Sequence, residues 1–206
     1  MTAGILGVPS AMAAKIRLDG LIGPLRLHSG ADVYDVCEAA NMACGIEEDA
    51  VDGINTKSED VTMRKTTIRA ALNKAVARYG HYKWTIRNNV VNVEPLHRTT
   101  DGQLSKKLAR VSIHGLSSLS AAITVLREAN INVLIVNSSS SFYGRVDFDL
   151  KDVTVREALN EIARQDGEFI WAFHPATDPS KNGGASFTSF RKMGMSIRDI
   201  HRIEHN

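Results

Sequence analysis

The amino-acid sequence predicts an α+β fold made of two tandem copies of one small domain, each with two helices packed on short β-strands in a βαββαββ-like order. A segment of 18 residues occurs at 67–84 and again at 154–171, and seven of its positions are identical. The interval from the first to the second predicted helix also repeats, with 35 residues in one copy and 36 in the other. We therefore expect the whole unit to be duplicated.

The repeated segment has the pattern of a capped helix followed by a strand. Thr67 and Thr154 are good N-cap residues, and Glu157 completes a capping box in the second copy. Gly80 and Gly167 are expected to end the two helices. Five apolar positions form the stripe expected to be buried: Ile68, Ala71, Leu72, Ala75 and Val76 in one copy, and Val155, Ala158, Leu159, Ile162 and Ala163 in the other.

In the first copy, alternating residues predict strands at 15–18 and 25–28. A helix is expected to begin near Asp32 and to end at Gly45, with Val33, Val36, Cys37 and Ala40 on its apolar face. Val61–Met63 has a strand pattern. Asn88 and Asn89 tolerate positive φ and predict a β-hairpin between 82–86 and 90–93.

The second copy is expected to follow the same plan. Its predicted elements are a strand at 111–114 ended by Gly115, a helix with Leu119, Ala122, Ile123 and Leu126 buried, a buried strand at 132–136, an alternating strand at 146–150, the capped helix, and a hairpin of 169–173 with 185–190. The expected boundaries are an N-terminal tail 1–24, a first unit 25–96, a linker 97–109, a second unit 110–190 and a basic amphipathic C-terminal tail 191–206.

The composition is that of a globular chain with a packed core. Apolar residues make up 43% of the 206 residues, and the net charge is +2, so extensive wrapping by nucleic acid is not favoured. Cys37 and Cys44 are seven residues apart in a stretch expected to be helical. Their Cα atoms would then lie about 10 Å apart along the helix axis. That separation predicts that they do not form a disulfide.

The N-terminal residues bear on the compartment. Residues 4–14 form a short apolar run with a proline and a small-x-small end, which is the pattern found at the end of an export signal. We expect a periplasmic or envelope-associated protein if the true start lies upstream, and a cytoplasmic protein otherwise. No run of the sequence is long and apolar enough for a transmembrane helix.

The order of helix, extended segment, second helix with the sequence V-T-V-R-E-A-L-N-E-I-A-R-Q-D-G, and hairpin resembles the secretin and TonB N-terminus short domain. The resemblance covers about 25–95 and 110–190. It implies small modules that bind protein partners or pack into rings at the bacterial envelope. It therefore implies a protein partner from the envelope or secretion machinery, or self-association, and it implies no enzyme activity, cofactor or small-molecule substrate.

The repeat also predicts candidate binding residues. Arg69 and Asn73, and their copies Arg156 and Asn160, stand at positions i and i+4 of the two helices. They are either an interaction surface that is used twice or local partners of a neighbouring strand or loop. Trp84 and Trp171 begin the two hairpins, where packing under the helix is favoured over stacking on a ligand.

Other motifs indicate little chemistry. His201 and His205 have the spacing of a metal-binding pair, but a solvated helix is the preferred interpretation. Cys37 is interpreted as a small core residue, and Gly183–Gly184 as a hairpin loop rather than a phosphate site. Asp147 and Asp149 share one face of a strand near Asp152, where a solvated face is favoured over acid–base chemistry or cation binding.

Three functions remain open at this stage. The first is a non-enzymatic, tandem protein-binding module of the cell envelope. The second is a small nucleic-acid-binding α+β protein, although no Gly-x-x-Gly loop of the KH type stands between the two helices of either copy. The third is an enzyme, which would need a concave polar site in which Asp147, Asp149 and a histidine converge.

Overall fold

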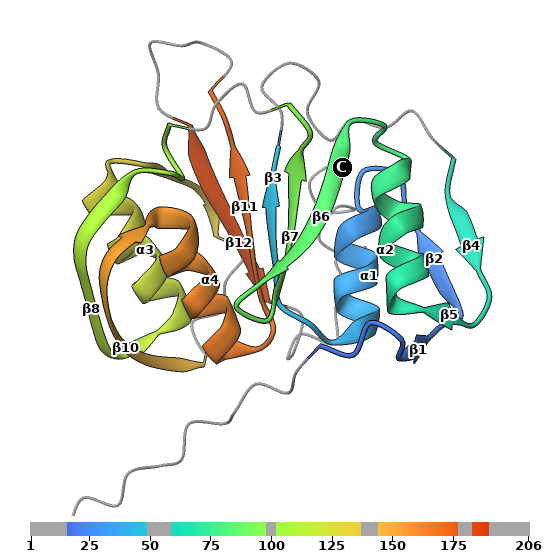
Figure 1. Cartoon of the computed structure of the whole chain (residues 1–206), viewed down its shortest axis with the longest axis horizontal. Helices are drawn as coiled ribbons and strands as arrows, with labels where there is room; N and C mark the ends of the chain where they lie inside the picture. The colour runs from blue at the N-terminus through green and yellow to red at the C-terminus, as the bar shows by residue number, and fades with distance from the viewer. Residues whose placement is uncertain (1–15, 49–58, 98–101, 137–143, 177–182, 190–206) are drawn as a thin grey trace, which may run out of the picture.

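A computed structural model describes residues 16–48, 59–97, 102–136, 144–176 and 183–189, and its fold is of the α+β class (Figure 1). The first half of the chain contains β1 (Leu21–Ile22), β2 (Leu25–Leu27), α1 (Asp32–Ala40), β3 (Cys44–Glu47), β4 (Val61–Met63), β5 (Thr66–Thr67), α2 (Ile68–Ala77), β6 (Tyr82–Arg87) and β7 (Val90–Pro95). The second half contains β8 (Lys107–Ser117), α3 (Ser118–Ala129), β9 (Asn132–Val136), β10 (Arg145–Thr154), α4 (Val155–Asp166), β11 (Phe169–His174) and β12 (Gly184–Ser189).

The two halves have the same strand pairings. In the first half, β6 and β7 form an antiparallel hairpin, β7 is parallel to β3, and β2 is antiparallel to β4. In the second half, β11 and β12 form the hairpin, β12 is parallel to β9, and β8 is antiparallel to β10. The correspondence of elements therefore extends from the helices to the sheet.

The two halves share one sheet, whereas the sequence suggested two small domains. Strands β3 and β11 pair in parallel and join two three-stranded sheets into one, in the order β6-β7-β3-β11-β12-β9. The end strands of this sheet, among the described residues, are β6 and β9. The cores exchange residues as well: Ile170 and Ala172 belong to the core of the first half, and Ala43 and Val90 to that of the second.

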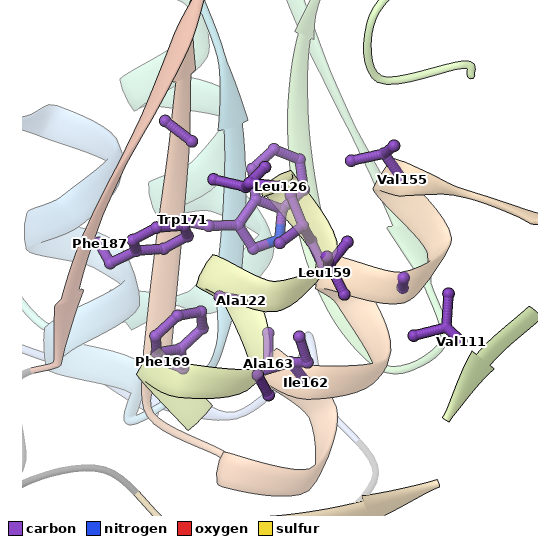
Figure 2. Packing of buried hydrophobic residues seen from close by; sticks show 14 of the residues in the cluster. Val111, Ala122, Leu126, Val155, Leu159, Ile162, Ala163, Phe169, Trp171 and Phe187 are labelled. Atoms are coloured by element: carbon purple, nitrogen blue, oxygen red, sulfur yellow. The ribbon is translucent and has the colours of Figure 1, made fainter. Parts of the chain in front are cut away.

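The helices of the two halves cover opposite faces of the sheet (Figure 1). The direction of the strands explains this arrangement. Strand β11 runs parallel to β3. Strand β6, which is the counterpart of β11 in the first half, runs antiparallel to β7 and therefore antiparallel to β3. The second half is thus turned over relative to the first. On its face Trp171 and Phe187 of the sheet pack beside Leu126 of α3 and Leu159 of α4 (Figure 2).

Local signals placed α4 and the start of α2 correctly, whereas α2 ends at Ala77 with Arg78 as its C-cap, before the predicted Gly80. The hydroxyl of Thr67 accepts from the backbone N–H of Ala70, and Thr154 forms the predicted capping box with Glu157. Both predicted apolar stripes are buried. Asn88 and Asn89 have φ of 49° and 60°, as the predicted hairpin turn requires.

The first helix ends earlier than predicted, and this overturns the prediction for the cysteines. Asn41, in the left-handed conformation with φ of 51°, ends α1, so that Cys44 and Gly45 lie in β3 instead of the helix. The chain reverses between the two cysteines and brings their Cα atoms to 6.5 Å. Cys37 and Cys44 form a disulfide.

Other predicted boundaries differ in the second half. Strand β8 begins at Lys107 and continues through Gly115 to Ser117, and Leu104 of the predicted linker is buried. The buried face of α3 is rotated relative to the prediction: it contains Ala121, Ala122, Val125, Leu126 and Ala129, while Leu119 and Ile123 are half-buried. The predicted buried strand β9 is an end strand, in which Leu134 is exposed.

The disulfide yields a first prediction. Reduction should lower the free energy of unfolding in urea by about 2 kcal/mol, because cross-linking residues seven apart removes conformational entropy from the unfolded chain. The double variant Cys37→Ser/Cys44→Ser should show no response to reductant. Detection of two thiols in the unfolded, unreduced protein would contradict the cross-link.

The capping box yields a pH-dependent prediction. The backbone N–H of Thr154 donates a hydrogen bond to the carboxylate of Glu157, and so does its hydroxyl. These bonds, the one from the backbone most of all, lower the pKa of the Glu157 carboxyl below its ordinary value of 4.5. Because the folded pKa is the lower one, this stabilisation is complete above 4.5 and is lost as the pH falls through the folded value. Thr154→Ala should cost about 1 kcal/mol at neutral pH, and less in acid.

A matched control exists at α3, whose N-cap Ser117 accepts from the backbone N–H of Ser120 and has no carboxylate in the capping pair. Ser117→Ala should cost a similar amount at every pH in chemical denaturation. Equal pH profiles for the two variants would argue against the role of Glu157.

Candidate functional site

The repeated residues Arg156, Asn160 and Trp171 lie together on one side of the second half. Arg156 and Asn160 are one turn apart on α4 and so project from the same face of the helix. Trp171 lies on the adjacent strand β11, and its indole Nε1–H donates to Oδ1 of Asn160 at 3.2 Å. The capped start of α4 and the hairpin therefore position the three side chains as one group, which we call the second triad.

The second triad binds β3, the strand of the first half that lies next to β11 in the shared sheet. Arg156 donates from Nε and Nη2 to the two carboxylate oxygens of Glu47 on β3, the latter at 2.9 Å. Arg156 is 6% exposed and Glu47 is 7% exposed. This bidentate geometry is the strongest kind of arginine–carboxylate contact, and here water is almost excluded from it.

Asn160 extends the contact to the next strand. Its Nδ2 donates to Oδ1 of Asn92 on β7 at 2.9 Å, and Nδ2 of Asn92 donates to the carbonyl of Val90 at 3.0 Å. Both asparagines are buried. The chain of hydrogen bonds from Trp171 to Val90 thus gives these buried amides partners within the protein.

Gly45 of β3 is the third part of the contact. Gly45 pairs directly with Trp171 across β3 and β11. A Cβ atom built on Gly45 would overlap the indole ring of Trp171. Glycine is therefore required at this position for the indole to lie flat against the strand.

The first half carries the same three side chains in an exposed setting. Nε1 of Trp84 donates to Oδ1 of Asn73 at 2.8 Å, which reproduces the pair formed by Trp171 and Asn160. Asn73 is exposed and Trp84 is half-buried. Arg69 is 52% exposed, and its Nε lies 3.7 Å from Asp19, which is 91% exposed. We call Arg69, Asn73 and Trp84 the first triad.

The first triad stands beside the end strand β6 of the sheet. Ile86 of β6 and Leu96 beyond the hairpin are exposed apolar residues. An open depression of about 490 Å³ adjoins Arg69 and is lined by Ile16, Arg17, Leu18, Asp19, Gly20 and Arg69. In the second half β3 lies against the second triad. In the first half no described strand occupies the corresponding place, because β6 is an end strand of the sheet.

The structure separates the four residues predicted to bind a partner. Arg69 and Asn73 are accessible to a second protein. Arg156 and Asn160 instead bind the other half of the same chain. This corresponds to the alternative in which these residues pair within the protein, although their partners are distant in sequence. Sequence reasoning missed Gly45, Glu47 and Asn92, since none of them lies in the repeated segment. The only signal for Gly45 and Glu47 was the Gly45-Ile46-Glu47 sequence in an otherwise apolar strand, and Asn92 had no such signal.

A second polar group gathers on the outer side of the β8–β10 ribbon. The Oγ of Ser112 lies 3.1 Å from Nε2 of His114 and donates to Asp149, a bond that lowers the pKa of the Asp149 carboxyl. Asp147 lies 3.8 Å from Nδ1 of His114. That distance is longer than a hydrogen bond, and His114, Asp147 and Asp149 are 61%, 66% and 50% exposed. These carboxylates lie on a solvated strand face, as predicted.

A third polar group, near the start of α1, joins the two helices of the first half. The buried carboxylate of Asp32 pairs with Arg78 and accepts from the hydroxyl of Tyr79 at 2.9 Å. Burial raises the pKa of both Asp32 and Tyr79. Because these groups bind one another, we interpret them as structural.

The remaining candidates provide no site within the described residues. The N–H of Gly183 donates to Gln103, and both Gly183 and Gly184 are buried, so they do not form an open loop. The structure described here contains no group of three His, Cys, Asp or Glu side chains placed to hold a metal ion. In the same residues no helix has the length and apolar character needed to cross a membrane. His201 and His205 lie outside the described residues.

Comparisons of the chain with protein-family models, with curated proteins and with solved structures found no match.

The two triads yield a prediction about stability. Arg156→Ala should lower the free energy of unfolding by about 3–5 kcal/mol, because it leaves Glu47 charged and buried without its partner. The matched change Arg69→Ala should cost less than about 0.5 kcal/mol, because Arg69 is exposed. Urea denaturation would measure both, and equal costs would contradict the difference in burial.

Proposed function

We propose that this protein is a non-enzymatic protein-interaction module of the bacterial cell envelope, and that the first triad is its binding site. One observation carries the proposal. The same arginine, asparagine and tryptophan, held by the same helix and hairpin, already bind a polypeptide strand in the second half. In the first half they stand at an end strand of the sheet and are accessible.

The chemistry of the first triad suits a protein ligand. An arginine fork recognises a carboxylate, an asparagine side chain recognises an amide, and an indole face packs on exposed backbone. An end strand adds main-chain hydrogen bonds to these contacts. Ile86 supplies exposed apolar surface on the same strand.

Two features support the envelope as the compartment. The disulfide between Cys37 and Cys44 is typical of proteins that fold in an oxidising environment such as the periplasm. The apolar, small-residue sequence 4–14 resembles the end of an export signal. The resemblance of both copies to secretin and TonB N-terminal short domains is consistent with this location and with a partner from the envelope or secretion machinery.

Site-specific photo-crosslinking in cells tests the proposal. A photo-reactive residue in place of Ile86 on β6 should give one discrete cross-linked product with another protein. Arg69→Glu combined with Asn73→Ala should reduce that product at least about tenfold, since a charge-assisted contact contributes about 1.5–3 kcal/mol.

The same photo-reactive residue at His114, on the outer side of β8, is the matched control and should give no such product. A product at Ile86 that persists in the Arg69→Glu/Asn73→Ala variant would show that the first triad is not the binding site.

A further inference from the structure

We propose that the ligand of the first triad is a single β-strand of another polypeptide that carries glycine and, two residues later, a carboxylate, and that this strand adds in parallel to β6. This inference rests on the proposed function and specifies its partner. It is drawn from the junction between β3 and β11, where the equivalent residues of the second half bind a strand of the first half.

The register of the junction gives the register of the ligand. Trp171 is paired with Gly45, and Phe173 with Glu47, in two parallel strands. The repeat relates Trp171 to Trp84 by 87 positions, so Phe173 corresponds to Ile86. The glycine of the incoming strand therefore pairs with Trp84, and its carboxylate pairs with Ile86 within reach of Arg69.

Each of these two ligand residues has a physical reason. Any side chain at the glycine position would occupy the space of the indole, as a Cβ on Gly45 would. The carboxylate would replace the loose contact of Arg69 with Asp19 at 3.7 Å by a bidentate ion pair. The backbone around the two arginines is also equivalent. The N–H of Arg69 donates to the carbonyl of Leu18, and the N–H of Arg156 donates to the carbonyl of Leu104.

A second copy of the same chain does not supply this strand. Its own β3 is already paired with β11. The counterpart of β3 in the second half is the end strand β9, where a register shift leaves Leu134 as an extra residue. Moreover, the sequence 132–141 contains neither glycine nor an acidic residue. Among the described strands only β3 carries a glycine followed two residues later by a carboxylate, so we infer that the ligand strand belongs to a different protein.

The test uses the full chain and a capped peptide with the sequence of residues 42–48, in which serine replaces Cys44. The protein has two tryptophans, so its NMR spectrum has two indole N–H signals, one from each triad. We expect saturable movement of the Trp84 signal and none of the Trp171 signal. The peptide changes Gly45→Leu and Glu47→Gln should each weaken binding about tenfold or more.

Protein variants complete the test. Arg69→Ala should weaken peptide binding to a similar extent, and Arg69→Glu should regain binding to the peptide with Glu47→Lys. Asp19→Asn, which removes the competing carboxylate, should bind the peptide at least as well as the parent protein. Circular dichroism would confirm that each variant is folded.

Four results would overturn the inference: no movement of the Trp84 signal at millimolar peptide, binding of the Gly45→Leu and Glu47→Gln peptides as tight as that of the unsubstituted peptide, movement of the Trp171 signal instead, or movement of the Trp84 signal with protein concentration alone. The last would identify a second copy as the ligand. If cross-linking at Ile86 depends on Arg69 and Asn73 but the peptide does not bind, only the proposed glycine-and-carboxylate strand is overturned. Cross-linking that is indifferent to both residues would overturn the proposed function itself.

Discussion

The contact between Arg156 and Glu47 is the interaction on which the rest of the structure depends. Two charges that are removed from water cost several kcal/mol each, and this cost is recovered only with good geometry and further hydrogen bonds. The bidentate pair and the neighbouring chain from Trp171 to Asn92 provide both. Together they hold β3 and β11 in one register, and that register makes a single sheet out of two halves.

The shared sheet explains why neither half forms a complete core. Ile170 and Ala172 pack among residues of the first half, while Ala43 and Val90 pack among those of the second. Because helices cover both faces, β11 is buried on both sides and is apolar at successive positions from Phe169 to Phe173. Strands covered on both faces lose the alternation that marks a half-exposed strand.

The sequence predicted what local interactions determine. Threonine caps, apolar stripes and the Asn88–Asn89 turn act within a few residues, and the structure confirms them. The end of α1 was misjudged because Asn41 ended the helix before Gly45, and the disulfide was missed for the same reason. Of the candidate site, the sequence predicted Arg69, Asn73, Arg156 and Asn160, but identical residues cannot show which copy is covered. That difference lies in Gly45, Glu47 and Asn92, which come near α4 only through long-range strand pairing.

The extra residue Leu134 in β9 has a consequence for how far the addition of strands could extend the sheet. Contacts between unlike surfaces usually propagate, since each added copy exposes a fresh acceptor, and rings or filaments result. Here one end of the described sheet carries the first triad beside β6, whereas the other end, β9, has a bulge and exposes the side chain of Leu134. Bulged end strands are poor templates for further pairing. Under the proposed function, the described sheet would therefore gain a strand at the β6 end and not at the β9 end.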